Sequence, residues 1–438
     1  MTVYNSRGCE KLKSSESVVV VGSGIAGDSA ASTIRRIDPT AYVTLISEER
    51  NPLYSPCAFH KFLSGELEVK RLFLKKLEDY SRDGIRTLFG KKATEIDLKI
   101  GKISIEGERI PFDKLILATG GNVRVPPVQG VAKRGVFTLK TMEDVEAVFH
   151  YPAKRAVVIG SGPIGTEAGM GLRSRGLEVS IIEIFNRVLP RLFDEQAALI
   201  LTEMMTQQGI RVLTEENVVE ISGGESARGV ITNKREIDCE MVIMAAGVRP
   251  NIELARLAGL DVGPLGGIKT NEYMMTSVEN IYSCGDCVES RDIISGENTL
   301  SQFWPNAKRQ GWVSGCNCVG RRTRFTGSLN ATSIEMNGTY AVSAGIGSVS
   351  MSSCHDHEII EKVLDSSYYR FILKDRRLVG VQLINKSEHA GLLFSRMLRK
   401  DDWAHLAEQI LNDKWVSMRP WNYWMSRYTS SFRETTSL

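Results

Sequence analysis

The fold is decided by the stretch Ser-Val-Val-Val-Val-Gly-Ser-Gly-Ile-Ala-Gly, residues 17–27. Its four consecutive valines are typical of a buried parallel strand, and the strand ends in a tight glycine turn. A helix is predicted to follow from about Ile25, and residues 41–46 form a second apolar strand that ends beside Glu48. This order of strand, glycine turn, helix and strand predicts a βαβ unit.

The same pattern returns at residues 155–183. An apolar run over 156–159 leads into the turn Gly-Ser-Gly-Pro-Ile-Gly at 160–165, and after a predicted helix the strand 177–182 ends beside Glu183. Two such units in one chain are most simply explained by two dinucleotides in electronic contact. The sequence therefore predicts an α/β fold with two Rossmann-like dinucleotide-binding domains.

The chain of 438 residues is long enough for two or three domains with separate cores. Beyond about residue 331 the pattern changes, since residues 368–373 and 378–383 are predicted to be antiparallel strands around a turn. The expected organisation is a polar N-terminal extension (1–16), a discontinuous first dinucleotide domain (17–122 and 248–330), a second dinucleotide domain (123–247) and a C-terminal α+β interface domain (331–438).

Each glycine of these turns has a mechanical purpose. The first permits the sharp turn, the second lets a pyrophosphate approach the backbone at a helix N-terminus, and the third lets helix and strand pack closely. The acid after the second strand would bind ribose hydroxyls and repel a 2′-phosphate, so Glu183 favours NAD(H), while the nearby Arg187 keeps NADP(H) open. The predicted cofactor-binding residues are Gly22, Gly24, Ala26, Gly27 and Glu48 in the first unit, and Gly160, Gly162, Ile164, Gly165 and Glu183 in the second.

Bulk composition gives few constraints on partners. Lys and Arg total 55 against 52 for Asp and Glu, and this balance gives no sign of a nucleic-acid partner. The N-terminal leader is polar and no segment has the length of a membrane span, so we expect a soluble, cytoplasmic protein without a membrane partner. Its eight cysteines are too sparse for a disulfide scaffold and are expected to be reduced.

Three further motifs follow in a recognisable order: Leu-Ile-Leu-Ala-Thr-Gly at 115–120, Met-Ala-Ala-Gly-Val-Arg-Pro-Asn at 244–251 and Asn-Ile-Tyr-Ser-Cys-Gly-Asp at 280–286. With the two glycine turns, they make residues 17–390 resemble the pyridine nucleotide-disulfide oxidoreductase family of FAD enzymes. The resemblance implies that the first domain binds FAD and the second NAD. It also implies cofactor contacts at Thr119, Gly120, Gly247, Gly285 and Asp286, with Asp286 holding a ribityl hydroxyl at a helix start.

The resemblance implies two catalytic residues. Cys57 stands where single-cysteine members similar to coenzyme A disulfide reductase and NADH oxidase carry a redox thiol. Close to His60 and Lys61 at a predicted helix start, this thiol is expected to have a lowered pKa; its alternative role is a small buried filler. Glu167 matches an acidic position near nicotinamide and flavin, and its alternative role is a solvated carboxylate in the first helical turn.

The remaining cysteines predict no metal site. Cys284 and Cys287 flank the last motif and are expected to pack in a core, and Cys316 and Cys318 point to different faces of a predicted helix. No cysteine group has iron–sulfur spacing, so a cluster would belong to a partner. A tryptophan-rich tail is expected to anchor an interface, with packing in a small core as the alternative; its tryptophans are Trp403, Trp415, Trp421 and Trp424.

Three functions remain open. The first is a subunit that passes electrons between NAD(H) and an iron–sulfur partner in a hetero-oligomer; in this the chain resembles the FAD subunit of NAD-linked 2-oxoacid oxidoreductases such as phenylglyoxylate dehydrogenase. The second is a stand-alone enzyme that reduces coenzyme A disulfide, a persulfide or oxygen through Cys57. The third is a flavin-bound structural subunit without turnover.

Overall fold

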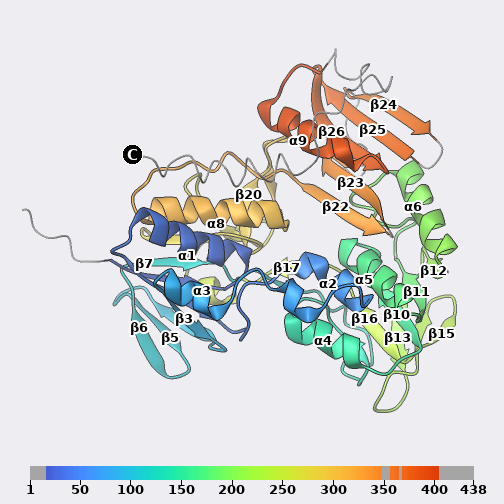
Figure 1. The fold of residues 1–438 in the computed structure, drawn as a ribbon, viewed down its shortest axis with the longest axis horizontal. Helices are drawn as coiled ribbons and strands as arrows, with labels where there is room; N and C mark the ends of the chain where they lie inside the picture. The colour runs from blue at the N-terminus through green and yellow to red at the C-terminus, as the bar shows by residue number, and fades with distance from the viewer. Residues whose placement is uncertain (1–15, 337, 348–355, 365–366, 404–438) are drawn as a thin grey trace, which may run out of the picture.

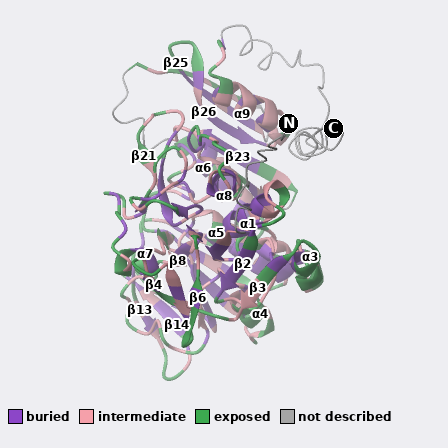
Figure 2. Ribbon diagram, turned by 90° about the vertical axis from the view of Figure 1, so that its left-hand side faces the viewer, coloured by how far each residue is buried: buried purple, intermediate pink, exposed green. Residues whose placement is uncertain are grey.

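The computed structural model describes residues 16–403 apart from 337, 348–355 and 365–366 (Figure 1). Two parallel sheets, each with helices packed against it, lie side by side, and an antiparallel sheet lies beside the second of them. Figure 2 shows the buried residues gathered in the strands and in the helices that face them. The predicted α/β class with two Rossmann-like units and a C-terminal antiparallel domain is confirmed.

The first parallel sheet has the strand order β19-β7-β1-β2-β3. The valine strand β1 lies in the middle of this sheet and all four of its valines are buried, which explains why this run of four residues is entirely apolar. Helix α8 packs along α1, and this contact requires Gly311, where a Cβ would lie 2.0 Å from the carbonyl oxygen of Ala26. The elements are β1 (Ser17–Val21), α1 (Ile25–Ile37), β2 (Tyr42–Ser47), β3 (Ile85–Phe89), β7 (Lys114–Leu117), β19 (Ile281–Ser283) and α8 (Trp304–Cys318). Strand β19 and helix α8, which follow the second unit in the sequence, therefore pack in the first unit.

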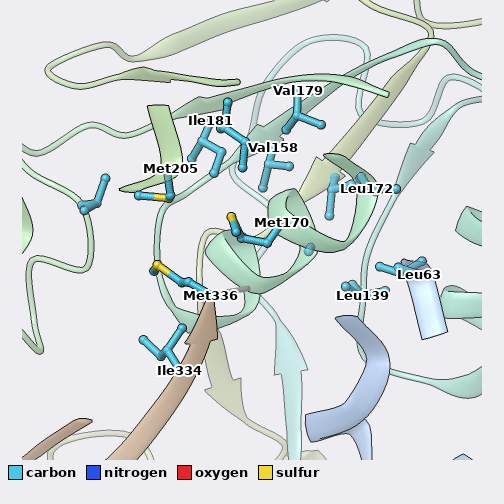
Figure 3. Packing of buried hydrophobic residues seen from close by; sticks show 14 of the residues in the cluster. Leu63, Leu139, Val158, Met170, Leu172, Val179, Ile181, Met205, Ile334 and Met336 are labelled. Carbon is cyan, nitrogen blue, oxygen red and sulfur yellow. The ribbon is translucent and has the colours of Figure 1, made fainter. Parts of the chain in front are cut away.

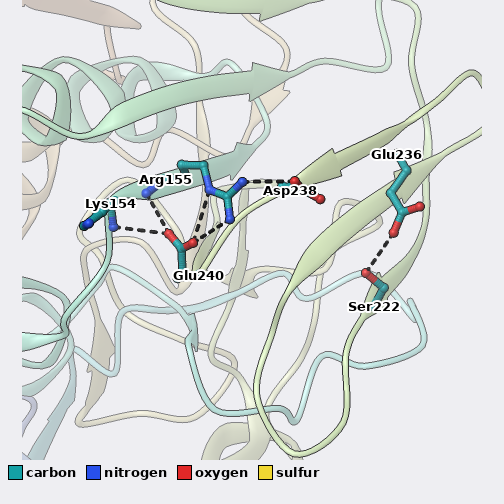
Figure 4. A network of polar contacts seen from close by, with 6 residues as sticks. All are labelled: Lys154, Arg155, Ser222, Glu236, Asp238 and Glu240. Carbon is teal, nitrogen blue, oxygen red and sulfur yellow. Dashed lines mark hydrogen bonds and ion pairs between the residues drawn. The ribbon is translucent and has the colours of Figure 1, made fainter.

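The second parallel sheet has the order β12-β11-β10-β16-β9. Its elements are β9 (Val136–Phe137), α4 (Met142–His150), β10 (Arg155–Ile159), α5 (Pro163–Ser174), β11 (Glu178–Ile182), α6 (Glu195–Gln207), β12 (Ile210–Leu213) and β16 (Met241–Met244). Helix α4 begins at a capping box, in which the Thr141 side chain accepts a hydrogen bond from the backbone of Asp144. At the opposite end of the sheet, Glu240 accepts hydrogen bonds from the backbone and guanidinium of Arg155 (Figure 4). This network joins the start of β10 to the segment that enters β16.

Small sheets and short helices complete these two units. Residues 108–117 form two strands that are separated at Phe112 and Asp113, and the two chain crossings between the units pair as antiparallel strands β8 and β17. The remaining elements here are η1 (Pro56–Ala58), α2 (Phe59–Leu63), η2 (Val69–Leu72), α3 (Leu77–Arg82), β4 (Ala93–Asp97), β5 (Lys102–Ile105), β6 (Glu108–Pro111), β8 (Gly121–Val123), β13 (Val218–Ser222), β14 (Gly229–Thr232), β15 (Glu236–Asp238), β17 (Val248–Pro250), α7 (Glu253–Leu257), β18 (Ile268–Lys269), β20 (Val288–Arg291) and β21 (Asn298–Thr299).

The C-terminal sheet has the antiparallel order β22-β23-β26-β25-β24. It consists of β22 (Ala331–Met336), β23 (Thr339–Gly345), β24 (Glu358–Leu364), β25 (Ser367–Lys374) and β26 (Arg377–Ile384), followed by η4 (Ser387–His389) and α9 (Ala390–Arg399). Ile334 and Met336 of this sheet join the core around Met170 of α5 (Figure 3). The C-terminal sheet therefore shares a hydrophobic core with the second dinucleotide unit.

The tryptophan prediction is wrong for Trp403. This side chain is only 1% exposed and packs on Phe371 of β25, with ring centroids 5.5 Å apart. It belongs to the chain's own core because α9 and β25 enclose it. Trp415, Trp421 and Trp424 lie outside the described residues.

Across the described part of the chain, every helix is too short or too polar to span a membrane.

Candidate active site

A single large cavity joins the two glycine turns. Its volume is about 2870 Å³, against roughly 300–1,000 Å³ for sites that hold one drug-sized ligand. All the predicted site residues line it except Gly27 and Gly165, which lie behind the turns. The cavity is large enough for two dinucleotides that meet.

The first turn has the shape that a pyrophosphate requires. Gly22 has φ +107°, and a Cβ there would lie 2.1 Å from the carbonyl oxygen of Ala118. A Cβ on Gly27 would lie 1.8 Å from the carbonyl oxygen of Gly22, whereas one on Gly24 would meet nothing within 4 Å. No side chain caps the N-terminus of α1, so its first N–H groups are available to an anion. These features fit FAD.

The second turn repeats this construction. Gly160 has φ +107° and approaches the carbonyl oxygen of Ala245, while a Cβ on Gly165 would lie 2.0 Å from the carbonyl oxygen of Gly160. The space around Gly162 is open within 4 Å, and α5 also lacks a side-chain cap. The residues fit a second dinucleotide.

The two acids that follow the turns lie in different environments. The Glu48 side chain is 68% exposed and pairs with Lys92 Nζ at 3.1 Å. Glu183 is buried and accepts hydrogen bonds from the backbone N–H of Ser161 at 2.9 Å and from its hydroxyl at 2.5 Å. The guanidinium of Arg187 donates to groups of its own loop. Glu183 therefore lines the cavity, and Arg187 does not.

The predicted helix start at Asp286 is wrong. Gly285, with φ +85°, directs the chain into a turn, and strand β20 follows. Gln310 of α8 holds this turn by accepting a hydrogen bond from the Gly285 N–H at 2.8 Å. Burial raises the pKa of Asp286 to about 6, and the charge of Lys140 opposes this shift. No local pattern in the sequence points to Gln310, because this residue contacts the motif only through the return of α8. The ribityl contact of Asp286 remains a prediction.

The Cys57 thiol opens into the cavity from η1, so its alternative role as a buried filler is wrong. The predicted lowering of its pKa is also wrong. The cavity walls desolvate a thiolate here, and the charges of Glu167 and Asp286 disfavour it further, so the pKa of Cys57 rises to about 11. The two nearby bases do not offset this, because His60 and Lys61 both lie against Glu335.

Glu167 projects from the first turns of α5 into the cavity, with only 19% of its side chain exposed. Burial raises its pKa to about 8, opposed by a hydrogen bond from the backbone of Glu335 and reinforced by the charge of Glu335. This carboxyl therefore binds a proton at neutral pH. It is not the solvated helix carboxylate that was its alternative role.

A histidine between two carboxylates is the main feature that the sequence did not reveal. His60 Nδ1 lies 3.9 Å from Glu167 Oε2, and His60 Nε2 lies 4.0 Å from Glu335 Oε2. Lys61 Nζ pairs with the same Glu335 oxygen at 2.9 Å. Glu335 comes from the C-terminal sheet, so no local pattern could have placed it beside Glu167.

The other cysteines that the structure describes are buried. Cys284 and Cys287 lie in hydrophobic cores, as predicted, and Cys316 and Cys318 are also fully enclosed. Within the described ranges, no three His, Cys, Asp or Glu side chains are grouped so as to hold a metal ion.

Comparison with known proteins gives concordant matches. A family model described as pyridine nucleotide-disulphide oxidoreductase matches residues 16–311. An NADH oxidase of Methanocaldococcus jannaschii is 38% identical over 73% of this chain and 75% of its own length. An NAD(P)H coenzyme A polysulfide/persulfide reductase of Pyrococcus horikoshii is 33% identical over 71% of this chain and 72% of its own. Among solved structures, an NAD-dependent persulfide reductase from A. fulgidus superposes with a TM-score of 0.83 at 29% identity, covering 90% of this chain and 78% of that one.

Proposed function

We propose that this chain, which belongs to the pyridine nucleotide-disulphide oxidoreductase family and is an FAD-dependent NAD(P)H oxidoreductase, uses Cys57 to reduce a sulfur–sulfur bond. The proposed substrate is a small thiol carrier in the form of a disulfide or a persulfide, such as coenzyme A disulfide. The observation that carries this proposal is the position of Cys57. It is the exposed cysteine of the described residues, and it lines the cavity that joins the two glycine turns.

The relatives support this function over the one predicted first. Two of the three comparison proteins carry names that state reduction of a persulfide, and one of these names coenzyme A. The hetero-oligomer with an iron–sulfur subunit, of the phenylglyoxylate dehydrogenase type, gains no support from these relatives. The third hypothesis, a subunit without turnover, is wrong because the chain is an enzyme.

The chain's own residues divide the work between binding and proton transfer. The open positions at Gly24 and Gly162 admit the two pyrophosphates, and the bound flavin supplies the redox chemistry between nicotinamide and sulfur. Because the pKa of Cys57 is about 11, its thiol first loses a proton to solvent, and the thiolate then attacks the sulfur–sulfur bond. A mixed disulfide forms as the other sulfur leaves, and Cys57 regains a proton when the flavin-supplied electrons release it. Glu167 is protonated at neutral pH, lines the same cavity as Cys57 and interacts with the Cys57 thiol through its charge, so it would give a proton to the leaving sulfur.

The overall reaction on a persulfide is balanced. R–S–S–H, NADH and one proton give R–SH, hydrogen sulfide and NAD⁺. Two electrons leave NADH, the sulfur–sulfur bond breaks, and each sulfur ends bound to hydrogen. One proton per turnover therefore comes from solvent.

Reduction of oxygen is a second candidate function. The observation that favours it is the match to the Methanocaldococcus jannaschii protein named NADH oxidase. The two candidates differ in their substrate, so they are separated by measuring NADH consumption with coenzyme A disulfide in the absence of oxygen and with oxygen alone.

A Cys57→Ser variant tests the proposal. We expect flavin reduction by NADH to stay within about twofold of the unchanged chain, while anaerobic turnover with coenzyme A disulfide falls by on the order of a thousandfold, because the nucleophile is lost. Stopped-flow absorbance of the FAD-loaded protein measures both steps. The matched control is Cys239→Ala, since Cys239 is buried away from the cavity. Undiminished turnover in Cys57→Ser would reject the thiol mechanism.

A further inference from the structure

The imidazole of His60 occupies an unusual position. Its two nitrogens are buried and make no hydrogen bond of good geometry, with only a weak contact to the Cys57 backbone, yet each faces a carboxylate at about 4 Å: Glu167 at 3.9 Å from Nδ1 and Glu335 at 4.0 Å from Nε2. Buried nitrogens that lack a good hydrogen bond disfavour folding, so this position points to a role other than stability.

Close packing of two helices brings the ring there. A Cβ on Gly171 of α5 would lie 2.6 Å from the carbonyl oxygen of His60 on α2, so only glycine permits this approach. The two helices make extensive contact, and β22 supplies Glu335 from the other side. Three elements that are distant in the sequence therefore fix the order Glu167, His60, Glu335.

This row of side chains runs from the cavity toward solvent. The exposed fraction is 19% for Glu167, 14% for His60 and 21% for Glu335. Lys61, which contacts Glu335 at 2.9 Å, is 28% exposed, and Glu66, 3.9 Å from the Lys61 ammonium, is 66% exposed. Together with Tyr340, whose charge interactions involve Glu335, Lys61 and Glu66, these groups surround the ring. A dinucleotide that fills the cavity would close the direct path of water to Glu167 but would leave this row open at its outer end.

We propose that His60 is a positioning residue that relays a proton from the Glu335 side to Glu167, so that Glu167 is protonated again after it has given its proton to the leaving sulfur. This inference rests on the proposed function. In each turnover His60 gains a proton at Nε2 and releases the one on Nδ1 to Glu167; the ring then returns to its starting tautomer by proton exchange with solvent, with no net change in proton number. The proton gained is the single solvent proton that the overall reaction consumes.

The protonation states suit this role. Burial lowers the pKa of His60, the charge of Glu335 opposes that shift and the charge of Lys61 reinforces it. The ring is therefore neutral at pH 7, with one nitrogen protonated and the other able to accept. Glu167, with a pKa of about 8, holds its proton at the same pH.

The test compares His60→Gln and Glu335→Gln with the matched control His150→Gln, in which an exposed histidine of α4 is replaced. In single-turnover experiments on the FAD-loaded protein at pH 7, we expect flavin reduction by NADH to stay within about twofold in all three. Steady-state anaerobic turnover with coenzyme A disulfide, which needs Glu167 to be protonated again after each cycle, should slow about 10- to 100-fold in the first two only, which is at or below the lower end of the range for loss of acid–base catalysis. In the unchanged chain the rate should rise with the thiolate fraction of Cys57 and then level off above about pH 8, where Glu167 loses its proton. Imidazole added to His60→Gln should restore at least half of the lost rate, which a purely structural role of the histidine would not allow.

A second measurement is independent of the sulfur substrate. In protein labelled with ¹⁵N-histidine, the His60 ring signals should titrate, and Glu335→Gln should shift that titration to lower pH because a facing negative charge is removed. Disulfide reduction unchanged in both variants, or failure of imidazole to rescue His60→Gln, would overturn the relay. If Cys57→Ser retains disulfide turnover, the proposed function fails separately, and an unshifted His60 titration in Glu335→Gln then rejects the relay on its own.

Discussion

The two glycine turns have the same backbone construction but different environments. In each, the third glycine touches the carbonyl oxygen of the first, and the middle glycine faces open space. The acids that follow differ, since Glu48 is exposed and Glu183 is buried against Ser161. The comparison indicates that a short motif determines backbone shape at both sites, whereas the electrostatic environment is determined by more distant parts of the fold.

The largest expected effect comes from filling the tight position in each turn. A methyl group in Gly27→Ala or Gly165→Ala would lie 1.8 or 2.0 Å from a carbonyl oxygen, so the helix must move away from its strand. We expect each variant to lose about 3 kcal/mol or more of stability, at or above the upper range for overpacking. Thermal unfolding and flavin absorbance measure the outcome.

The two tight positions should nevertheless differ in which cofactor they affect. Gly27→Ala should yield colourless protein, while Gly165→Ala should keep its flavin and lose NADH-dependent bleaching. Gly224→Ala is the control, since its position is exposed and has nothing within 4 Å. Loss of flavin from Gly165→Ala alone would show that the two units do not bind independently.

An intermediate effect is expected at the open positions. In Gly24→Ala and Gly162→Ala the added methyl meets no protein atom within 4 Å, so the melting temperature should change by less than about 2 °C. The methyl would instead occupy the path of a pyrophosphate, and we expect affinity for FAD or NADH to fall about 10- to 100-fold, equal to about 1.4–2.8 kcal/mol. Fluorescence titration of each cofactor tests this separation of folding from binding. Unchanged affinity in both variants would contradict the assignment of the turns to pyrophosphates.

Much of the fold was predictable because its signals are local. The valine run of β1 and the glycine turns depend on neighbouring residues alone, so β1, α1, β10 and α5 lie where the sequence placed them. The structure at the end of the last motif does not depend on neighbouring residues alone. The turn at Gly285, with its positive φ, replaces the expected helix start and leads into β20.

The chemistry of the site was less predictable because it depends on distant contacts. Cys57 and Glu167 do line one cavity, but the raised pKa of the thiol reflects the carboxylates around it rather than the bases that follow it in the sequence. The row Glu167, His60 and Glu335 exists only because Ile334 and Met336 anchor the C-terminal sheet in the core of the second unit. Likewise, tryptophan content could not decide between an interface and a core for Trp403.

The smallest expected effects distinguish the two acids. Glu183→Gln replaces a buried carboxylate that accepts two hydrogen bonds from Ser161. We expect the KM for NADH to rise about tenfold. Discrimination against NADPH should also weaken, because the charge that opposes a 2′-phosphate is gone.

Glu48→Gln changes a mostly exposed side chain, and the ion pair of Glu48 with Lys92 is exposed too. The free energy of unfolding should therefore change by less than about 0.5 kcal/mol, and the affinity for FAD by less than about fivefold. Steady-state kinetics with both nicotinamides and flavin-release titration measure the two effects, with Lys92→Met as the control for the exposed pair. Equal losses at the two positions would mean that burial of the acid does not determine its contribution to binding. The differing environments of the two turns would then have no functional consequence.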